Sequence, residues 1–302
     1  MNGNSPGVGV IVYHFVKTVI AKRWNSMVLD KSRIFAVLLM VIVAGSVRAE
    51  EAKEVVIASA KELKGTKAKK ITWKKDEAKM VLVKPYVPTQ YEEKATFDRV
   101  GNPITKKVKV SDASPSLWVD TTEVTVGQFK KFLKSSGYKP AVPINWNVVY
   151  NYSPTDKYPM IMVNWHDATS YAKWVGKRLP TEAEWEFAAR GGLVSKEFPW
   201  GDDESVAREY ANYAGIGGKD QWEGWPSGGT APVGSFKPNG YGLFDMVGNV
   251  FELCTEKGVL RGGSWLNGAN LLRVDDRDFI NPTVAGSSSG FRCVSGFPAA
   301  QQ

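Results

Sequence analysis

The chain has 302 residues, of which 43% are hydrophobic and 12% aromatic, a composition typical of a globular protein with a sizeable core. Its formal net charge of +8 is distributed unevenly: residues 1–49 carry +5, residues 50–110 carry +6 and residues 111–302 carry −3. A nucleic-acid-binding domain needs its basic residues on folded structure, so this distribution argues against one. Two His and two Cys exclude a zinc ribbon and argue strongly against a multi-histidine metal centre.

Residues 1–49 are interpreted as a leader containing a signal peptide, with the true start possibly at Met27. Two basic residues precede an apolar run over residues 34–45, and short side chains lead up to Ala49, where signal peptidase would cleave. The run is shorter than the ~20 residues of a membrane-spanning helix. We therefore expect an exported protein, periplasmic or otherwise extracytoplasmic; an uncleaved membrane anchor is the alternative.

Residues 50–77 are predicted to form a Lys-rich tether. The stretch is rich in Lys, Glu and Ala and poor in large apolar residues, so it is expected to be mobile or loosely helical. Its lysines could contact an anionic surface or be simply solvated. The folded domain is then expected over residues 78–298, followed by a short tail, residues 299–302.

Short strands are predicted over residues 80–83, 108–110 and 117–119 from their apolar runs. Three helices of about ten residues each should follow, because each apolar stripe is preceded by a capping residue and followed by glycine. The predicted caps and ends are Thr125 and Gly137, Asn164 and Gly176, and Thr181 and Gly191. Isolated helices of this length are unstable, so they must pack on a common core.

The C-terminal part of the chain is rich in glycine and tryptophan. Twenty of the 29 Gly lie between residues 191 and 296, a density that indicates many tight turns. Short strands are predicted over residues 248–253, 259–265 and 290–294. Together these features predict one α+β domain that is unusually rich in loops.

Six segments of this domain resemble, in order, the formylglycine-generating enzyme (sulfatase-modifying factor) superfamily. They are WVDTTEVTVGQF, VNWHDATSYAKWVGKRLPTEAEWEFAARGG, FPWGDD, GTAPVGSFKPNGYGLFDMVGNVFEL, RGGSW and GFRCV, and the resemblance runs from about Met80 to Phe297. It implies a C-type-lectin-like fold with low regular secondary structure, small antiparallel sheets and flanking helices.

The resemblance also bears on catalysis. The superfamily's best-known members oxidise a sulfatase Cys to formylglycine with two Cys, five positions apart after the RGGS motif, which bind copper(I). The RGGSW motif places these positions at Asn267 and Leu272, and neither is a thiolate. A second branch holds iron with three His, whereas His166 is the only His after the leader. We therefore expect no copper, no iron and no catalytic residue; an oxidoreductase of the same superfamily is the alternative.

A polar loop after the RGGSW motif is the candidate binding surface. The resemblance places it where the enzymes have their active-site cleft. Its candidate ligand-binding residues are Trp265, Asn267, Asn270, Arg273, Asp275 and Arg277, with Asp276 and Asp278 beside them. We expect this surface to recognise a protein partner or a subunit of an envelope complex. A lectin-like module that binds a peptide or glycan and a merely solvated loop are the alternatives.

A calcium site is expected in the segment GLFDMVGNVFEL. Asp245 and Glu252 supply hard carboxylate oxygens, and Gly248 and Val250 can supply backbone carbonyls, a donor set that suits calcium. The resemblance implies the same four residues. In the alternative reading, Asp245 caps a turn and Glu252 pairs with an arginine such as Arg261 or Arg292. The family's second calcium site would match Asn212 and Tyr213, but Trp225 stands where an Asp is expected.

The two cysteines, Cys254 and Cys293, are placed near the ends of predicted strands. Because an exported protein folds in an oxidising compartment, we expect a disulfide between them.

Overall fold

The computed structural model describes most of the chain after residue 53. The described residues are 54–63, 66–83, 91–97, 103–109, 117–214 and 228–296. The expected leader and tail lie outside them. Among the residues that are described, no helix is both long and apolar enough to span a membrane.

A five-stranded sheet joins the two ends of the described chain. Its strands, in spatial order, are β1 (Val56–Ile57), β2 (Lys70–Trp73), β3 (Lys79–Val83), β6 (Leu117–Asp120) and β11 (Val294–Ser295). β1 and β2 are parallel and the other pairs are antiparallel, with Val81 opposite Val119. All four residues of β6 are buried, as expected for a strand covered on both faces.

The tether prediction is wrong for residues 54–63 and 66–77. They form β1, the 3₁₀ helix η1 (Ala60–Leu63) and β2. Among their side chains, Ile57, Ile71 and Trp73 are at most 5% exposed, and the Trp73 indole N–H donates to the Val175 carbonyl at 2.9 Å. The many Lys and Glu residues around them concealed three well-placed core residues, and the folded domain therefore begins before residue 78.

A four-stranded sheet lies in the C-terminal half, in the order β10 (Ser289–Gly290), β7 (Phe251–Leu253), β8 (Val259–Arg261) and β9 (Arg277–Phe279). β10 runs parallel to β7, so this sheet is mixed. The strands are shorter than predicted because Gly248 and Asn249 before β7, and Gly262 and Gly263 after β8, have positive φ angles.

A two-stranded hairpin pairs β4 (Tyr91–Phe97) with β5 (Pro103–Lys109). The strand predicted over residues 108–110 coincides with the end of β5.

The three predicted helices are confirmed as α3 (Val126–Ser136), α5 (Trp165–Val175) and α6 (Glu182–Ala189). Each begins at its predicted cap with a complete capping box. Gly137 and Gly176 end the first two in the left-handed conformation. Two further helices, α4 (Trp146–Tyr152) and α7 (Ala207–Tyr210), were not predicted, because helices of seven and four residues are too short to show a repeating apolar stripe. Short 3₁₀ turns lie at η2 (Glu204–Val206) and η4 (Ala269–Leu271).

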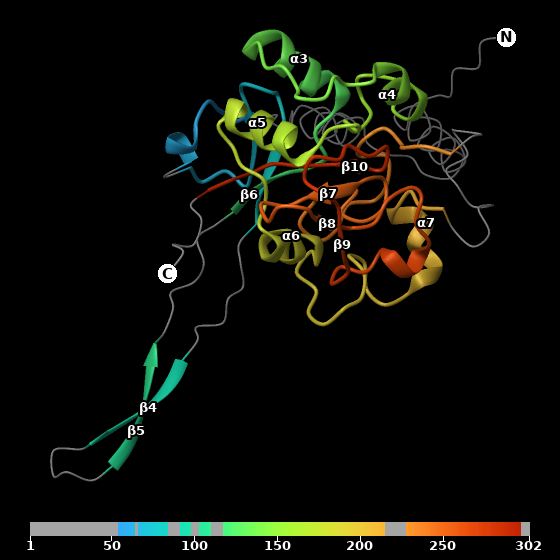
Figure 1. The fold of residues 1–302 in the computed structure, drawn as a ribbon. Helices are drawn as coiled ribbons and strands as arrows, with labels where there is room; N and C mark the ends of the chain where they lie inside the picture. Colours follow the sequence, from blue (N-terminus) through green and yellow to red (C-terminus); the bar gives the residue numbers. More distant parts are fainter. Residues whose placement is uncertain are drawn as a thin grey trace, which may run out of the picture. The chain divides into compact units, whose positions relative to one another are not determined.

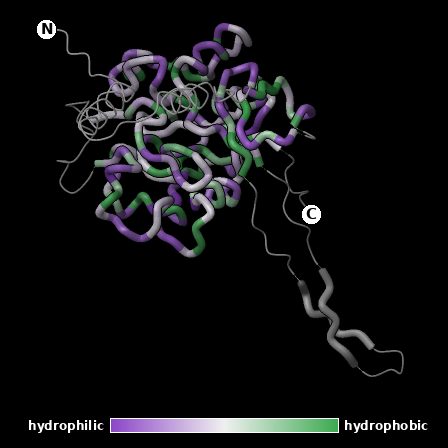
Figure 2. The backbone as a smooth tube through the Cα atoms, turned by 180° about the vertical axis from the view of Figure 1, so that it is seen from behind, coloured by the Kyte–Doolittle hydropathy of each residue, from purple (hydrophilic) through white to green (hydrophobic). Residues whose placement is uncertain are grey.

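The helices cover both sides of the four-stranded sheet (Figure 1). α3, α4 and α5 lie on one side with a buried cluster that includes Phe129, Tyr171 and Phe291, whereas α6 and α7 lie on the other with a cluster that includes Trp185 and Leu272. Hydropathy along the backbone mixes green apolar stretches with purple turns over short distances (Figure 2). This alternation matches an α+β fold made of short elements and many loops.

Candidate functional site

The candidate binding loop starts from a tight turn after β8. The Ser264 hydroxyl donates to Asn267 Oδ1 at 2.6 Å, and the Asn267 carbonyl accepts from the Ala214 amide at 2.8 Å. Leu272 is fully buried. The resemblance places the two thiolates of the enzymes at these positions. This chain has instead an amide side chain at Asn267, which is hydrogen-bonded to Ser264, and a core leucine at Leu272.

Trp265 supports the loop from within. It is 5% exposed, its indole N–H donates to the Ser287 carbonyl at 3.2 Å, and its ring centroid lies 5.2 Å from that of Tyr152. This predicted ligand-binding residue is therefore a packing residue that fixes the position of the loop, since little of its ring is accessible to a partner.

The charged residues of the loop pair with one another, with Glu197 and with α6. Arg273 lies 2.9 Å from Glu197 and 3.2 Å from Asp275, and this hydrogen bond from Arg273 lowers the pKa of Asp275. Arg277 lies 3.4 Å from Glu182 of α6. The pairs are half-exposed and solvent-screened, so each contributes little to stability. Their groups remain accessible for recognition.

A cavity of about 200 Å³ opens beside the edge strand β9. It is lined by Phe251, Gly263, Leu271, Asp276, Arg277 and Asp278. The structure thus brings Arg277 of the predicted set to a cavity, whereas Asn270, Arg273 and Asp275 lie elsewhere on the loop. Phe279, the last residue of β9, is 65% exposed. Apolar walls with charges of both signs suit an extended peptide or a protein side chain.

Glu252, one of the four expected calcium ligands, is paired with other side chains. Both oxygens of Glu252 are occupied: Arg292 Nε lies 2.9 and 2.8 Å from Oε1 and Oε2, Arg292 Nη2 lies 2.7 Å from Oε1, and the Trp185 indole donates to Oε2 at 2.8 Å. Glu252 therefore pairs with Arg292, as the alternative interpretation of the sequence proposed. A four-residue set that includes Glu252 therefore does not fit, because its lone pairs already accept hydrogen bonds.

Asp245 behaves differently. Its Oδ2 accepts from the Gly234 amide at 2.6 Å, whereas its buried Oδ1 meets no N–H or hydroxyl donor among the described residues. Glu123, which was not singled out from the sequence, likewise has a buried oxygen, Oε2, without such a donor in the described part of the chain, and a hydrogen bond between the Glu123 and Asp245 carboxyl groups acts to lower the pKa of Asp245. The only sequence signal at this position is an acidic residue between a buried strand and a helix cap. Within the described part of the chain, no three Asp, Glu, His or Cys are grouped as metal ligands.

The second calcium site is not supported by the contacts of Asn212. This side chain is buried and its amide donates to the Gly229 carbonyl and to Asn249 Oδ1, at 2.9 and 3.3 Å. Trp225 lies outside the described residues.

The predicted disulfide is not formed. Cys254 and Cys293 are both free thiols, both fully buried, and they belong to different buried clusters on either side of the four-stranded sheet. Burial raises the pKa of each thiol well above its ordinary value, so neither is a reactive thiolate. The disulfide was predicted because both cysteines lie near strand ends, but the sequence does not say which sheet each strand joins.

The fold and the loop define a loop-rich α+β domain that presents a polar, partly apolar surface beside β9. The chain belongs to the family of sulfatase-modifying factor enzyme 1-like domains, whose family model matches residues 68–296. This match includes residues 68–77, the last ten residues of the segment that the sequence analysis had assigned to the tether.

Curated relatives include catalytic and inactive proteins. The chain is 38% identical over 165 residues to a formylglycine-generating enzyme of Streptomyces coelicolor, a match that covers 46% of this chain and 52% of the relative. It is 40% identical over 163 residues to the inactive C-alpha-formylglycine-generating enzyme 2 of Bos taurus, covering 46% and 51%. The matches thus span about half the length of these relatives.

Solved structures share the fold. PvdO from Pseudomonas aeruginosa superposes with a TM-score of 0.54 and 25% identity, covering 74% of this chain and 97% of that one. The Treponema denticola variable protein 1 superposes with a TM-score of 0.51 and 22% identity, covering 75% and 98%. The α+β, loop-rich fold expected from the resemblance is confirmed.

Proposed function

We propose that the chain is an exported, non-catalytic member of its family that acts as a binding or structural subunit in the cell envelope. The observation that carries the proposal is the pair of positions Asn267 and Leu272. Copper(I) chemistry needs accessible thiolates, whereas Asn267 accepts a hydrogen bond from Ser264 and Leu272 lies in the core. The two thiols of the chain are buried elsewhere. The similarity to an inactive relative supports the same conclusion.

The surface that would bind a partner is the cavity beside β9. Arg277, Asp276 and Asp278 provide charges of both signs, and Phe251 and Leu271 provide apolar contact. This combination suits a peptide segment of a protein partner better than a small metabolite, because the cavity is smaller than the ~300 Å³ of common ligand pockets. A glycan-binding module is the second candidate and would be recognised by affinity for sugars on an array.

Export is part of the proposal. Cleavage after Ala49 would remove none of the described residues, which begin at Glu54. Mass spectrometry of the protein recovered from its own cells should find a mature N-terminus near residue 50. A full-length chain in the cytoplasmic fraction would contradict this part of the proposal.

Catalysis can be tested by incubating the protein with copper and with a peptide that carries the Cys-x-Pro-x-Arg sulfatase motif. We expect no oxidation of the peptide Cys, with a catalytic relative as the positive control. Turnover by this chain would establish the alternative, an oxidoreductase.

Partner binding is tested by the native size of the gently extracted protein, followed by mass spectrometry. We expect the chain to migrate with fixed companions in a larger assembly. Reversing the charges at the cavity with Arg277→Glu and Asp278→Lys should release it, whereas Lys130→Glu on α3, far from β9 in the sequence, should not. A free monomer in every case would argue against a structural subunit.

A further inference from the structure

A strongly basic surface lies at the β1 edge of the five-stranded sheet, within the segment predicted as a tether. Seven lysines and three glutamates are exposed among residues 54–63 and 66–79, an excess of four positive charges, whereas residues 111–302 carry a net charge of −3. Because β1, η1 and β2 are folded, these lysines belong to a defined surface. The blue segment that contains η1 lies at one margin of the domain (Figure 1).

Strand pairing places several of these side chains on one face of the sheet. Val56 of β1 is opposite Thr72 of β2, and Thr72 is opposite Lys79 of β3, so the three share a face. Side chains alternate along a strand, so Lys70, two positions before Thr72, is on the same face, and Lys74 follows the end of β2 directly. Val56 is 51% exposed. The face therefore combines lysines with an exposed aliphatic side chain.

The acidic residues of this segment already have partners, whereas most of its lysines do not. The acidic residues and their partners are Glu54 with Lys79, Glu62 with the Ala58 amide, Asp76 with Lys177, and Glu77 with Lys131. Five exposed lysines make no ion pair or hydrogen bond with another described residue: Lys61, Lys67, Lys69, Lys70 and Lys74. No described side chain thus competes with an external anion for these five charges.

The arrangement suits an extended anionic surface. A single small anion needs donors that converge on one point, whereas lipid head groups can move to meet lysines that are spread along strands. Val55 and Val56, 36% and 51% exposed, can contact the acyl boundary beneath the head groups. A nucleic acid backbone offers no such apolar layer. Charge and exposed valines together therefore favour a bilayer over a soluble polyanion.

The position of this surface in the chain also favours a bilayer. Eight residues separate the apolar run of the expected leader, residues 34–45, from Glu54, the first described residue. An extended chain covers at most ~3.6 Å per residue, so eight residues span at most ~30 Å. While the leader is attached, the basic surface therefore stays within reach of the membrane that the leader enters.

We propose that the five unpaired lysines, with Val55 and Val56, dock the domain on a bilayer that contains anionic phospholipids. Each lysine near such a surface strengthens binding about fivefold, and the attraction acts within about 10 Å at 0.1 M salt. This membrane contact is separate from the partner site beside β9 and does not depend on it.

The test is co-sedimentation of the protein, purified from its own cells, with vesicles of phosphatidylcholine alone or mixed with phosphatidylglycerol. We expect tighter binding to the mixed vesicles, and raised salt should weaken it. A retained apolar leader would bind both kinds of vesicle, so the ratio of the two affinities reports on the basic surface. Lys70→Gln and Lys74→Gln should each lower the affinity for mixed vesicles about fivefold. Both variants should melt like the wild type, because the side chains are exposed and unpaired.

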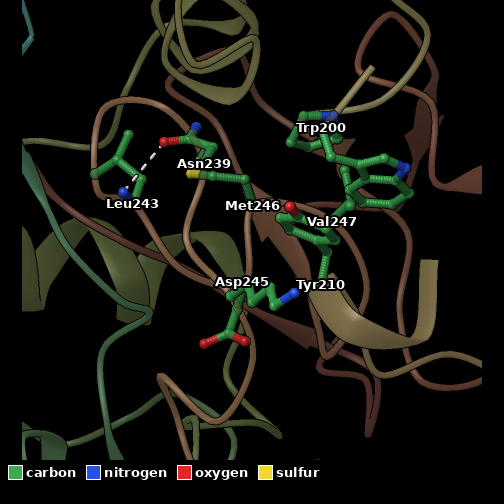
Figure 3. Close-up of a pocket in the computed structure, with 9 residues that line it drawn as sticks. Trp200, Tyr210, Asn239, Leu243, Asp245, Met246 and Val247 are labelled. Atoms are coloured by element: carbon green, nitrogen blue, oxygen red, sulfur yellow. Dashed lines mark hydrogen bonds between the residues drawn. The ribbon is translucent and has the colours of Figure 1, made fainter. Parts of the chain in front are cut away.

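Lys157→Gln combined with Lys237→Gln is the matched control for the double variant, because it removes the same charge from other elements. Lys157 follows α4, and Lys237 lines a cavity of about 10 Å³ with Trp200 and Tyr210, whose rings are stacked 5.0 Å apart (Figure 3). Helices α4 and α7 lie at the margin of the domain opposite the blue segment (Figure 1). This control should bind mixed vesicles like the wild type.

Three results would overturn the proposal. The first is equal binding to the two kinds of vesicle, and the second is an equal loss for the two double variants. The third is tighter binding to inorganic polyphosphate than to mixed vesicles, which would assign the lysines to a soluble polyanion. Arg277→Glu with Asp278→Lys should leave vesicle binding unchanged, so failure of the partner site and failure of the membrane contact are distinguishable.

Discussion

Arg292 and Glu252 form a two-pronged ion pair in the interior of the domain, with 2.7 Å between Arg292 Nη2 and Glu252 Oε1 and both side chains 1% exposed. Glu252 lies on β7, and the Arg292 guanidinium also donates to the carbonyl of Asp120 at the end of β6. The pair therefore links the four-stranded sheet to the five-stranded sheet. Removing either partner leaves a buried charge without compensation.

We expect Arg292→Met to lower the free energy of unfolding by about 3–5 kcal/mol, the usual cost of breaking a buried ion pair. Urea denaturation at fixed calcium concentration measures the change. Lys196→Met is the control, since Lys196 pairs with Asp202 at 2.6 Å but both are about half exposed. Its cost should be under about 1 kcal/mol. Equal losses for the two variants would show that burial does not decide the strength of the Arg292–Glu252 pair.

Gly248 and Gly242 give a matched test of backbone crowding. Their φ angles are +75° and +81°, so an alanine is strained in the same way at either position. A Cβ at Gly248 would lie 2.5 Å from the Asn212 carbonyl oxygen, whereas one at Gly242 would meet nothing within 4 Å. Gly242→Ala should cost about 1–2 kcal/mol. Gly248→Ala should cost clearly more, as judged by urea midpoint, and similar midpoints would refute the predicted clash.

The stability of the domain should depend on the ionisation of Asp120. Burial raises the pKa of Asp120 to about 6 from 3.8, against the opposing effect of Lys177 at 2.7 Å. The second carboxylate on Lys177 is Asp76, and the Cys293 amide donates to Asp120 at 3.1 Å.

Because the pKa is higher in the folded state, the contribution of Asp120 is fully present below about pH 4 and is lost as the pH rises through about 6. Asp120→Asn cannot titrate at this position. The free energy of unfolding of the wild type minus that of Asp120→Asn should therefore fall between about pH 4 and 6 and stay level above about 7. Urea denaturation across this range measures it, and a difference that grows with pH would contradict the sign.

The cysteines should behave as two free, protected thiols. Both are fully buried, and burial raises the pKa of each. Native protein should react with a thiol reagent only on the time scale of unfolding. Protein unfolded in guanidinium without reductant should react with two equivalents of the reagent per chain. The same sample treated with reductant is the control. If the two thiols reacted only after reduction, the disulfide predicted from the sequence would be present after all.

The sequence by itself determined the local features of this protein. The capping boxes at Thr125, Asn164 and Thr181 join residues three positions apart, so the starts of α3, α5 and α6 could be read directly. The order of six motifs likewise determined the family and, through it, the fold. Such features depend on neighbours along the chain or on patterns that need no coordinates.

Only the tertiary structure decided how distant residues pair. Glu123 accepts a hydrogen bond from Asn249 across 126 positions and Trp73 donates to the Val175 carbonyl across 102, so neither the buried contact of Glu123 nor the core role of the supposed tether had a local signal. The choice of Arg292 over calcium as the partner of Glu252, and the separation of Cys254 from Cys293, follow from which strands enter which sheet. The sequence gives the chemistry of each side chain, but the packing that buries the side chain determines which partner it contacts.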